Sequence, residues 1–180
     1  MRPGGGGRTD RRRVGVAAVM RAAAAAGAMG VVTLPAAPAD SLHVRAVAAE
    51  AGDADSDRLL IEGAWRVVSI EVDGTVNESD DVRRITTRNG RDGAWTLFVD
   101  GVELAAGTSA IDASATPKTI DLEFTSGPNA GRTSYGIYEA TRSSRRICYA
   151  EAGRARPGAF STEAGSGRTL VVFERVEAAR

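Results

Sequence analysis

One segment of the sequence combines residue types that could bind a charged ligand: Arg156-Pro157, followed by Phe160. Proline fixes the backbone, and the phenylalanine can anchor the segment in a core. Arg156 could then make a bidentate bond to a carboxylate. Two interpretations stay open, a clamp for an anion at the mouth of a binding site, or an internal ion pair that staples the fold. The candidate partners of such an internal pair are Asp121, Glu123, Glu139 and Glu151.

The same carboxylates could supply the acid–base pair of a glycosidase. Asp121 and Glu123, however, alternate with apolar residues, which places them on the polar face of a strand where solvated carboxylates are normal. Cys148 is expected to be a buried small hydrophobe, with a reactive thiol as the alternative. A thiol nucleophile needs a base, and His43, the single histidine, lies in a different part of the chain. We therefore expect no catalytic residues and no enzymatic activity.

Composition excludes further classes of protein. One Cys and one His among 180 residues cannot form an intrachain disulfide framework and make a zinc site unfavourable, so we expect no metal and no cofactor. Lys and Arg total 23, as do Asp and Glu, whereas a general nucleic-acid binder needs a basic excess. Gly165-Ser166-Gly167 lacks the Lys-Ser/Thr continuation and the following helix of a phosphate-binding loop.

Residues 1–39 predict a secretory signal peptide. Arg11-Arg12-Arg13 lie in a basic region, an apolar run covers residues 22–34, and Ala37-Pro38-Ala39 offers a cleavage site after Ala39. The apolar run is too short to span a bilayer, which takes about 20 residues. We expect export to the periplasm or the cell exterior, with no membrane span in the mature chain. The alternative is an alanine-rich extension or a misplaced start codon.

Residues 40–57 predict a flexible linker, because this stretch is rich in Ala, Asp and Gly and poor in large apolar residues. The leader holds six arginines and one aspartate, so it carries +5 and residues 40–180 carry −5. A mildly acidic mature chain disfavours nucleic acid and anionic membrane surfaces as partners. At the end of the linker, Ser56-Asp57 before residues 58–62 predicts a single capped helical turn.

From Gly63 onward the sequence predicts short strands separated by turn residues. Residues 119–125 alternate between apolar and polar side chains, which is typical of a half-buried antiparallel strand. Asp73-Gly74 and Asp100-Gly101 are dipeptides typical of hairpin turns. The predicted strands cover residues 64–72, 81–87, 94–99, 102–108, 119–125, 132–140, 145–151 and 168–176.

About eight such strands without long helices predict an all-β fold, an antiparallel up-and-down barrel with a short helical turn before its first strand. Closure is favoured because it removes exposed sheet edges; a β-sandwich is the alternative. A barrel of eight strands has room for its own side chains or one small ligand. The predicted domain covers residues 58–176, and residues 177–180 form a tail.

Gly63-Ala64-Trp65 at the start of the first predicted strand resembles the Gly-x-Trp signature of lipocalin-like barrels. Together with six further segments, this motif makes the chain resemble a lipocalin-like domain family abundant in planctomycete bacteria, over about residues 58–176. The resemblance implies the barrel fold and frequent export, and it implies no activity. The other matching segments are Arg66–Ser69 with Asp73-Gly74, Pro117–Leu122, Gly136–Glu139, Ile147–Tyr149, Arg156–Phe160 and Gly165–Gly167.

In lipocalins a basic residue of the last strand packs over this tryptophan. The resemblance therefore implies that Trp65 closes one end of the barrel, with Arg168 or Arg175 above its ring in a cation–π contact. The residues to which we assign a structural role are Gly63, Trp65, Pro157, Cys148 and Arg175.

The function expected from the sequence is that of a binding module. It would take a small, partly apolar molecule or a peptide at the open end of the barrel, contacted by Arg156, Phe160 and Tyr138. The alternative is a structural or protein-interaction module of the cell envelope, with a filled barrel and an envelope protein as its partner. The interior volume separates the two, since ligand pockets measure on the order of a few hundred Å3.

Overall fold

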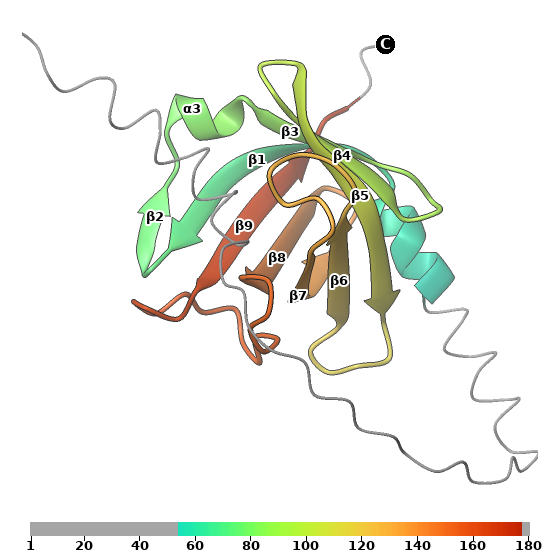
Figure 1. Cartoon of the computed structure of the whole chain (residues 1–180). Helices are drawn as coiled ribbons and strands as arrows, with labels where there is room; N and C mark the ends of the chain where they lie inside the picture. The colour runs from blue at the N-terminus through green and yellow to red at the C-terminus, as the bar shows by residue number, and fades with distance from the viewer. Residues whose placement is uncertain (1–53, 178–180) are drawn as a thin grey trace, which may run out of the picture.

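The computed structural model describes residues 54–177, so the predicted signal peptide and most of the predicted linker lie outside the described residues. The described chain is almost entirely strand and loop (Figure 1). Its strands are β1 (Gly63–Val72), β2 (Thr75–Asn77), β3 (Ile85–Asn89), β4 (Ala94–Val99), β5 (Val102–Asp112), β6 (Thr119–Phe124), β7 (Thr133–Ala140), β8 (Ser144–Ala150) and β9 (Arg168–Arg175).

The sheet closes on itself. Every neighbouring pair is antiparallel, in the order β2-β1-β3-β4-β5-β6-β7-β8-β9, and β1 also pairs with β9. Along one edge of β1, residues 63–66 pair with β3 and residues 70–72 pair with β2. The barrel itself therefore consists of eight strands, β1 and β3 to β9, with β2 as a short arm on β1. The predicted up-and-down barrel is confirmed.

Aspartate-glycine turns join two of the hairpins. Asp73 and Asp100 adopt φ values of 51° and 52°, and the glycines that follow them adopt 72° and 80°. Left-handed backbone at both central residues matches the twist of the flanking strands, and glycine adopts it without a steric cost. These turns place β2 against β1, and β5 against β4.

The prediction of a strand over residues 81–87 was wrong for the first half of this range. A short helix, α3 (Asp80–Arg83), occupies that place, and β3 begins only at Ile85. Asp80 and Asp81 in the first turn favour helix because carboxylates are stabilised near a helix N-terminus, and Val82 is the buried residue of the helix. Strand β2 was not predicted, and β5 continues four residues further than expected, to Asp112.

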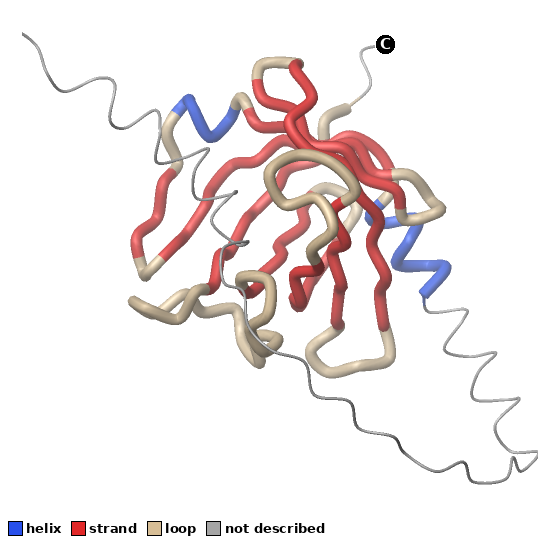
Figure 2. Tube along the Cα trace, in the orientation of Figure 1, coloured by secondary structure: helices blue, strands red, loops and turns tan. Residues whose placement is uncertain are grey.

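The helix before β1 covers residues 54–61, rather than the single turn predicted at 58–62, and lies across one end of the barrel (Figure 2). Asp57, assigned to the linker from the sequence, is buried: Lys118 Nζ lies 2.8 Å from its Oδ2, and Tyr138 donates a 2.5 Å hydrogen bond to the same oxygen. Arg58 donates to Ser109 Oγ.

Neither helix within residues 54–177 is long and apolar enough to cross a membrane.

The core lies inside the barrel. Alternate residues of each strand point inward, for example Trp65 and Val67 of β1 against Arg175 and Phe173 of β9. Gly107 of β5 makes room for the ring of Trp95, because a Cβ at this position would collide with that ring and with a backbone oxygen of β6. Trp95 in turn meets Phe124 edge to face, with ring centroids 5.0 Å apart.

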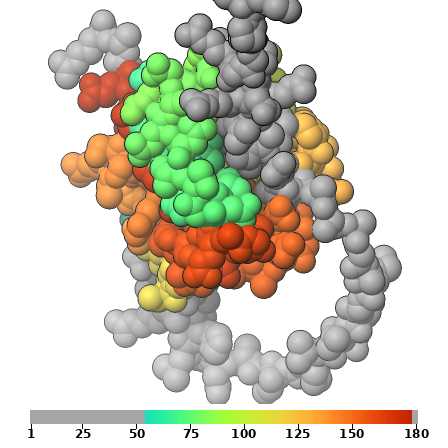
Figure 3. All heavy atoms as spheres, turned by 90° about the vertical axis from the view of Figure 1, so that its left-hand side faces the viewer, coloured from blue at the N-terminus to red at the C-terminus, as the bar shows by residue number. Residues whose placement is uncertain are grey.

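A second packed layer covers part of the outer surface. Ile137 of β7 and Cys148 of β8 are paired across the ladder and fully buried, although their strand neighbours Tyr138 and Ile147 belong to the core inside the barrel. The segment between β8 and β9 accounts for this, because Cys148 Sγ contacts Ser161 O. The same segment packs beside β2 and the β1–β2 turn, where Gly165 N donates to Asp73 (Figure 3).

Candidate functional site

Trp65 closes the end of the barrel at which helix 54–61 lies. Its ring is fully buried, and its Nε1 donates a 2.7 Å hydrogen bond to Ile61 O. The guanidinium carbon of Arg175 lies 4.2 Å from the ring centroid, so of the two arginines considered from the sequence it is Arg175 that stacks there. Arg175 also donates to the backbone oxygens of Leu60 and Glu62, which ties the helix to β9.

Gly63 has a steric reason to be glycine. Its φ is +109°, which side chains rarely adopt, and a Cβ there would lie 2.8 Å from Arg175 Nη1. The absence of a side chain thus lets the Arg175 guanidinium reach Trp65 and the helix carbonyls.

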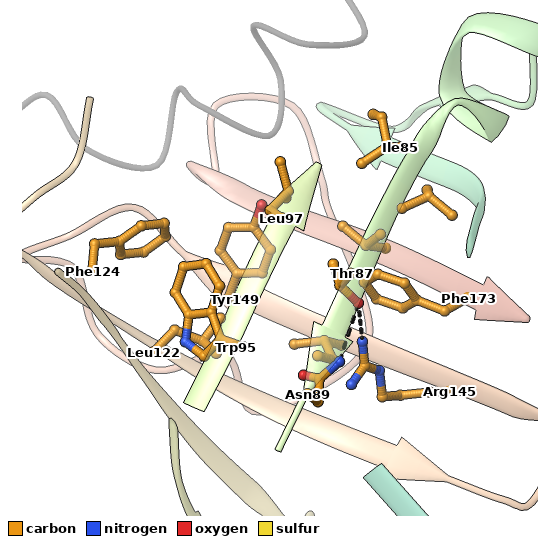
Figure 4. A pocket seen from close by; sticks show the side chains of 13 residues that line it. Ile85, Thr87, Asn89, Trp95, Leu97, Leu122, Phe124, Arg145, Tyr149 and Phe173 are labelled. Atoms are coloured by element: carbon orange, nitrogen blue, oxygen red, sulfur yellow. Dashed lines mark hydrogen bonds between the residues drawn. The ribbon is translucent and has the colours of Figure 1, made fainter. Parts of the chain in front are cut away.

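A cavity of about 80 Å3 remains inside the barrel, and its walls are almost wholly apolar (Figure 4). This volume has room for about five water molecules. It falls between the two expectations stated above, a pocket of a few hundred Å3 and a filled barrel. The lining residues are Val67, Ile85, Thr87, Asn89, Trp95, Leu97, Leu122, Phe124, Arg145, Ile147, Tyr149, Val171 and Phe173.

The polar end of the cavity is formed by Arg145, at the start of β8. Its side chain is buried (4% exposed), and its guanidinium carbon lies 4.3 Å from the ring centroid of Phe173 and 4.9 Å from that of Trp65. Nη2 donates a 3.0 Å hydrogen bond to Thr87 Oγ1, whereas Nε has no hydrogen-bond partner within residues 54–177. Arg145 forms no ion pair with any acid of the described chain.

Burial and the positive charge of Arg175 lower the pKa of the Arg145 guanidinium to about 9. The group is therefore still a cation at pH 7. The lowered pKa shows that the folded barrel disfavours this charge, because neither solvent nor a carboxylate compensates it.

Thr87 and Asn89 of β3 complete the polar end. Thr87 Oγ1 accepts hydrogen bonds from both Arg145 Nη2 and Asn89 Nδ2, as the dashed lines of Figure 4 show. With both N–H groups donating to this oxygen, the hydroxyl proton of Thr87 is available to donate. The cluster is rich in donors and carries a net positive charge, and it lies beside an apolar cavity.

The three residues predicted to contact a ligand do not line this cavity. Arg156 lies among backbone and side-chain acceptors of β6 and β7: it donates to Ile120 O, to Gly136 O and, at 2.6 Å, to Asp121 Oδ1. Of the two interpretations left open by the sequence, this geometry is that of the internal ion pair. Phe160 lies under the guanidinium of Arg146, whose carbon is 4.1 Å from the ring centroid.

Tyr138, the third of these residues, is fully buried and hydrogen-bonded to Asp57 beneath the helix. Burial, followed by the hydrogen bond to the Asp57 carboxylate, raises the pKa of the Tyr138 phenol far above its ordinary value. Burial likewise raises the pKa of Tyr149, which does line the cavity. Both phenols are therefore neutral at physiological pH.

Pro157 and Cys148, the remaining residues assigned a structural role, are both fully buried. Burial raises the pKa of the Cys148 thiol, which disfavours the reactive thiolate. Of the four acids considered for a glycosidase, Asp121 pairs with Arg156, Glu139 with Arg146 and Glu151 with Arg154. None of the four lines the cavity.

Sequence reasoning missed Arg145, although a signal for it is present. In the predicted strand 145–151, Arg145, Ile147 and Tyr149 occupy alternate positions, so they share one face of the strand. Since Ile147 and Tyr149 are residues that a barrel buries, the pattern puts an arginine on the inward face.

No protein-family model matches the sequence, and no curated protein matches it. Two solved structures are similar. One is a DUF4847 family protein from Bacteroides vulgatus ATCC 8482, with 12% identity and a TM-score of 0.43 over 69% of this chain and 99% of that chain. The other is a lipocalin-like protein from Bacteroides uniformis ATCC 8492, with 13% identity and a TM-score of 0.42 over 64% and 98%. The resemblance to the planctomycete lipocalin-like family stays a prediction.

Proposed function

We propose that the protein is a binding module that holds a small, partly apolar molecule inside its barrel. The observation that supports this is the cavity, whose wall is mostly apolar side chains and whose lining residues include the hydrogen-bonded cluster of Arg145, Thr87 and Asn89. Small-molecule sites commonly combine an apolar lining with a few convergent polar groups. Because no carboxylate and no thiol of residues 54–177 lines the cavity, we infer binding rather than catalysis.

The volume limits the ligand. About 80 Å3 admits a molecule of a few non-hydrogen atoms, so of the two ligand classes expected from the sequence the small molecule is favoured over a peptide. A structural or interaction module of the envelope remains the alternative function. The feature that favours the alternative is the same small volume, which is close to that of a filled barrel.

We also infer, from the basic and apolar pattern of residues 1–39 alone, that the protein is exported, and from the motif set that it belongs to the planctomycete lipocalin-like family. N-terminal sequencing of the protein purified from its native cells tests the export. The expected first residue is Asp40, and an intact Met1 would refute export by this leader.

Filling the cavity should abolish binding. Leu122 lines the cavity from β6, and a Leu122→Trp substitution places additional ring atoms in the free space. Benzene is an apolar probe that binds in dry cavities of proteins, and it should cause saturable NMR shifts of the lining residues in the unaltered protein. We expect Leu122→Trp to weaken this binding at least about tenfold, which corresponds to ~1.4 kcal/mol.

The matched control is Glu123→Trp, since Glu123 is the next residue of β6 and is exposed on the outer face. It should bind benzene as the unaltered protein does. If the unaltered barrel shows no saturable shifts, or if both variants bind equally, the interior is not a binding site and the structural module is the better description.

A further inference from the structure

We propose that the ligand of this cavity is a small carboxylate, whose anionic group pairs with Arg145 and whose apolar part lies among the inward side chains of β4 and β6. This inference rests on the proposed function, because it names the chemical class of the molecule that the barrel interior binds. It assigns a ligand-binding role to Arg145, Thr87 and Asn89.

The first argument is the unmatched charge. A buried guanidinium is ordinarily paired with a carboxylate, since removing an ion from water costs several kcal/mol. Arg145 is 4% exposed. The charged group that acts on its pKa is Arg175, a second cation, which disfavours the charged form of Arg145. No acid of residues 54–177 offers it an ion pair, so an anion from outside the described chain would supply the missing partner.

The second argument is the direction of the hydrogen bonds. Arg145 Nε–H lacks an acceptor although it is fully buried, and Asn89 and Arg145 both donate to one oxygen of Thr87. Buried polar groups are nearly always satisfied in folded proteins. A planar carboxylate could accept the Nε–H and a neighbouring N–H of the guanidinium. Because Nε has almost no exposed surface in the ligand-free fold, the apolar side chains between it and the cavity must move aside when the carboxylate binds.

The rest of the cavity determines what is attached to the carboxylate. Leu97, Leu122, Phe124 and Tyr149 form apolar walls beyond the polar cluster, and Figure 4 shows Phe124 and Leu122 at the opposite end of the pocket from Arg145. Inorganic anions would leave these walls unoccupied. A short aliphatic chain on a carboxylate fills both parts.

The aromatic rings near Arg145 give the competing explanation. Stacking on Trp65 and Phe173 stabilises a guanidinium, so Arg145 could be a purely structural residue. Stacking leaves the in-plane N–H donors unpaired, however, and the orphaned Nε–H is one of these donors. If Arg145 is purely structural, the cavity should bind acids and their neutral analogues equally. The two explanations therefore predict different binding results.

Butanoate and butanamide separate the explanations, because they have nearly the same shape and differ in charge. The test is an NMR titration of the purified protein with each compound at pH 7. We expect butanoate to bind at least tenfold more tightly than butanamide. Arg145→Met should remove this preference, whereas Arg145→Lys, which keeps the charge, should retain part of it.

Arg146→Met is the control, because Arg146 adjoins Arg145 in β8 but points outward to Glu139. It should leave the preference for butanoate unchanged. Equal binding of the acid and the amide to the unaltered protein would overturn the carboxylate inference and leave the proposed function standing. Binding of neither compound, together with no binding of benzene, would overturn both.

Discussion

Replacing Trp65 by alanine is expected to lower the free energy of unfolding by about 3–5 kcal/mol, the range for removal of a fully buried tryptophan. The ring is 0% exposed, and the variant loses its hydrogen bond to Ile61 O as well as its packing. The guanidinium groups of Arg145 and Arg175 would then face a void instead of a ring. A loss of this size is a large fraction of the stability of a domain.

Chemical denaturation monitored by the fluorescence of Trp95 measures this effect, since Trp95 is the second of the two tryptophans and lies elsewhere in the core. Leu59→Ala is the control, because Leu59 lies in the helix at residues 54–61, next to Trp65, and is 52% exposed. It should change the free energy of unfolding by less than about 1 kcal/mol. A loss below that value for Trp65→Ala would show that the ring does not close the barrel.

Replacing Arg145 by methionine should have the opposite sign and stabilise the ligand-free protein by about 1–3 kcal/mol. Methionine occupies the space of the aliphatic part of arginine and removes a buried charge without a counter-ion. The variant gives up one hydrogen bond to Thr87 and the stacking on Phe173 and Trp65, which offset part of the gain. A gain in stability with a loss of carboxylate binding is the signature of a residue kept for its ligand.

The neighbouring residue again supplies the comparison. Arg146 is 44% exposed in its side chain and pairs with Glu139 on the surface, so Arg146→Met should change stability by no more than about 1 kcal/mol. Urea denaturation of the three proteins without ligand gives the result. If Arg145→Met is less stable than the unaltered protein by more than about 1 kcal/mol, Arg145 holds the core together and its burial needs no ligand.

Most of the barrel could be predicted because its signals are local. Asp-Gly turns and the alternation within residues 119–125 both act over a few residues, and together they indicate antiparallel hairpins. Closure of the barrel, between β1 and β9, removes the exposed edges of such a sheet. The helix at Asp80–Arg83 was missed because β-branched residues on either side of it favour strand. The helix includes Asp57, whose tertiary contacts with Lys118 and Tyr138 no local pattern encodes.

The site was harder to predict for the same reason. Arg156 is conspicuous in the sequence because of its neighbours Pro157 and Phe160. In the structure, however, its guanidinium donates hydrogen bonds to Ile120, Gly136 and Asp121 within the protein. Arg145 has no distinctive neighbours in the sequence. It is a candidate ligand-binding residue because no acid of residues 54–177 forms an ion pair with it. Such an absence becomes visible only when the strands of the barrel are brought together.

The most direct test of a ligand inside the barrel is native mass spectrometry of the protein purified from its own cells, under conditions that preserve non-covalent complexes. The predicted result is a complex heavier than the bare chain by the mass of one small acid, with the bare mass restored on denaturation. If only the bare mass is found in gentle conditions, with no added mass at any stage of purification, the barrel does not carry a ligand in the cell.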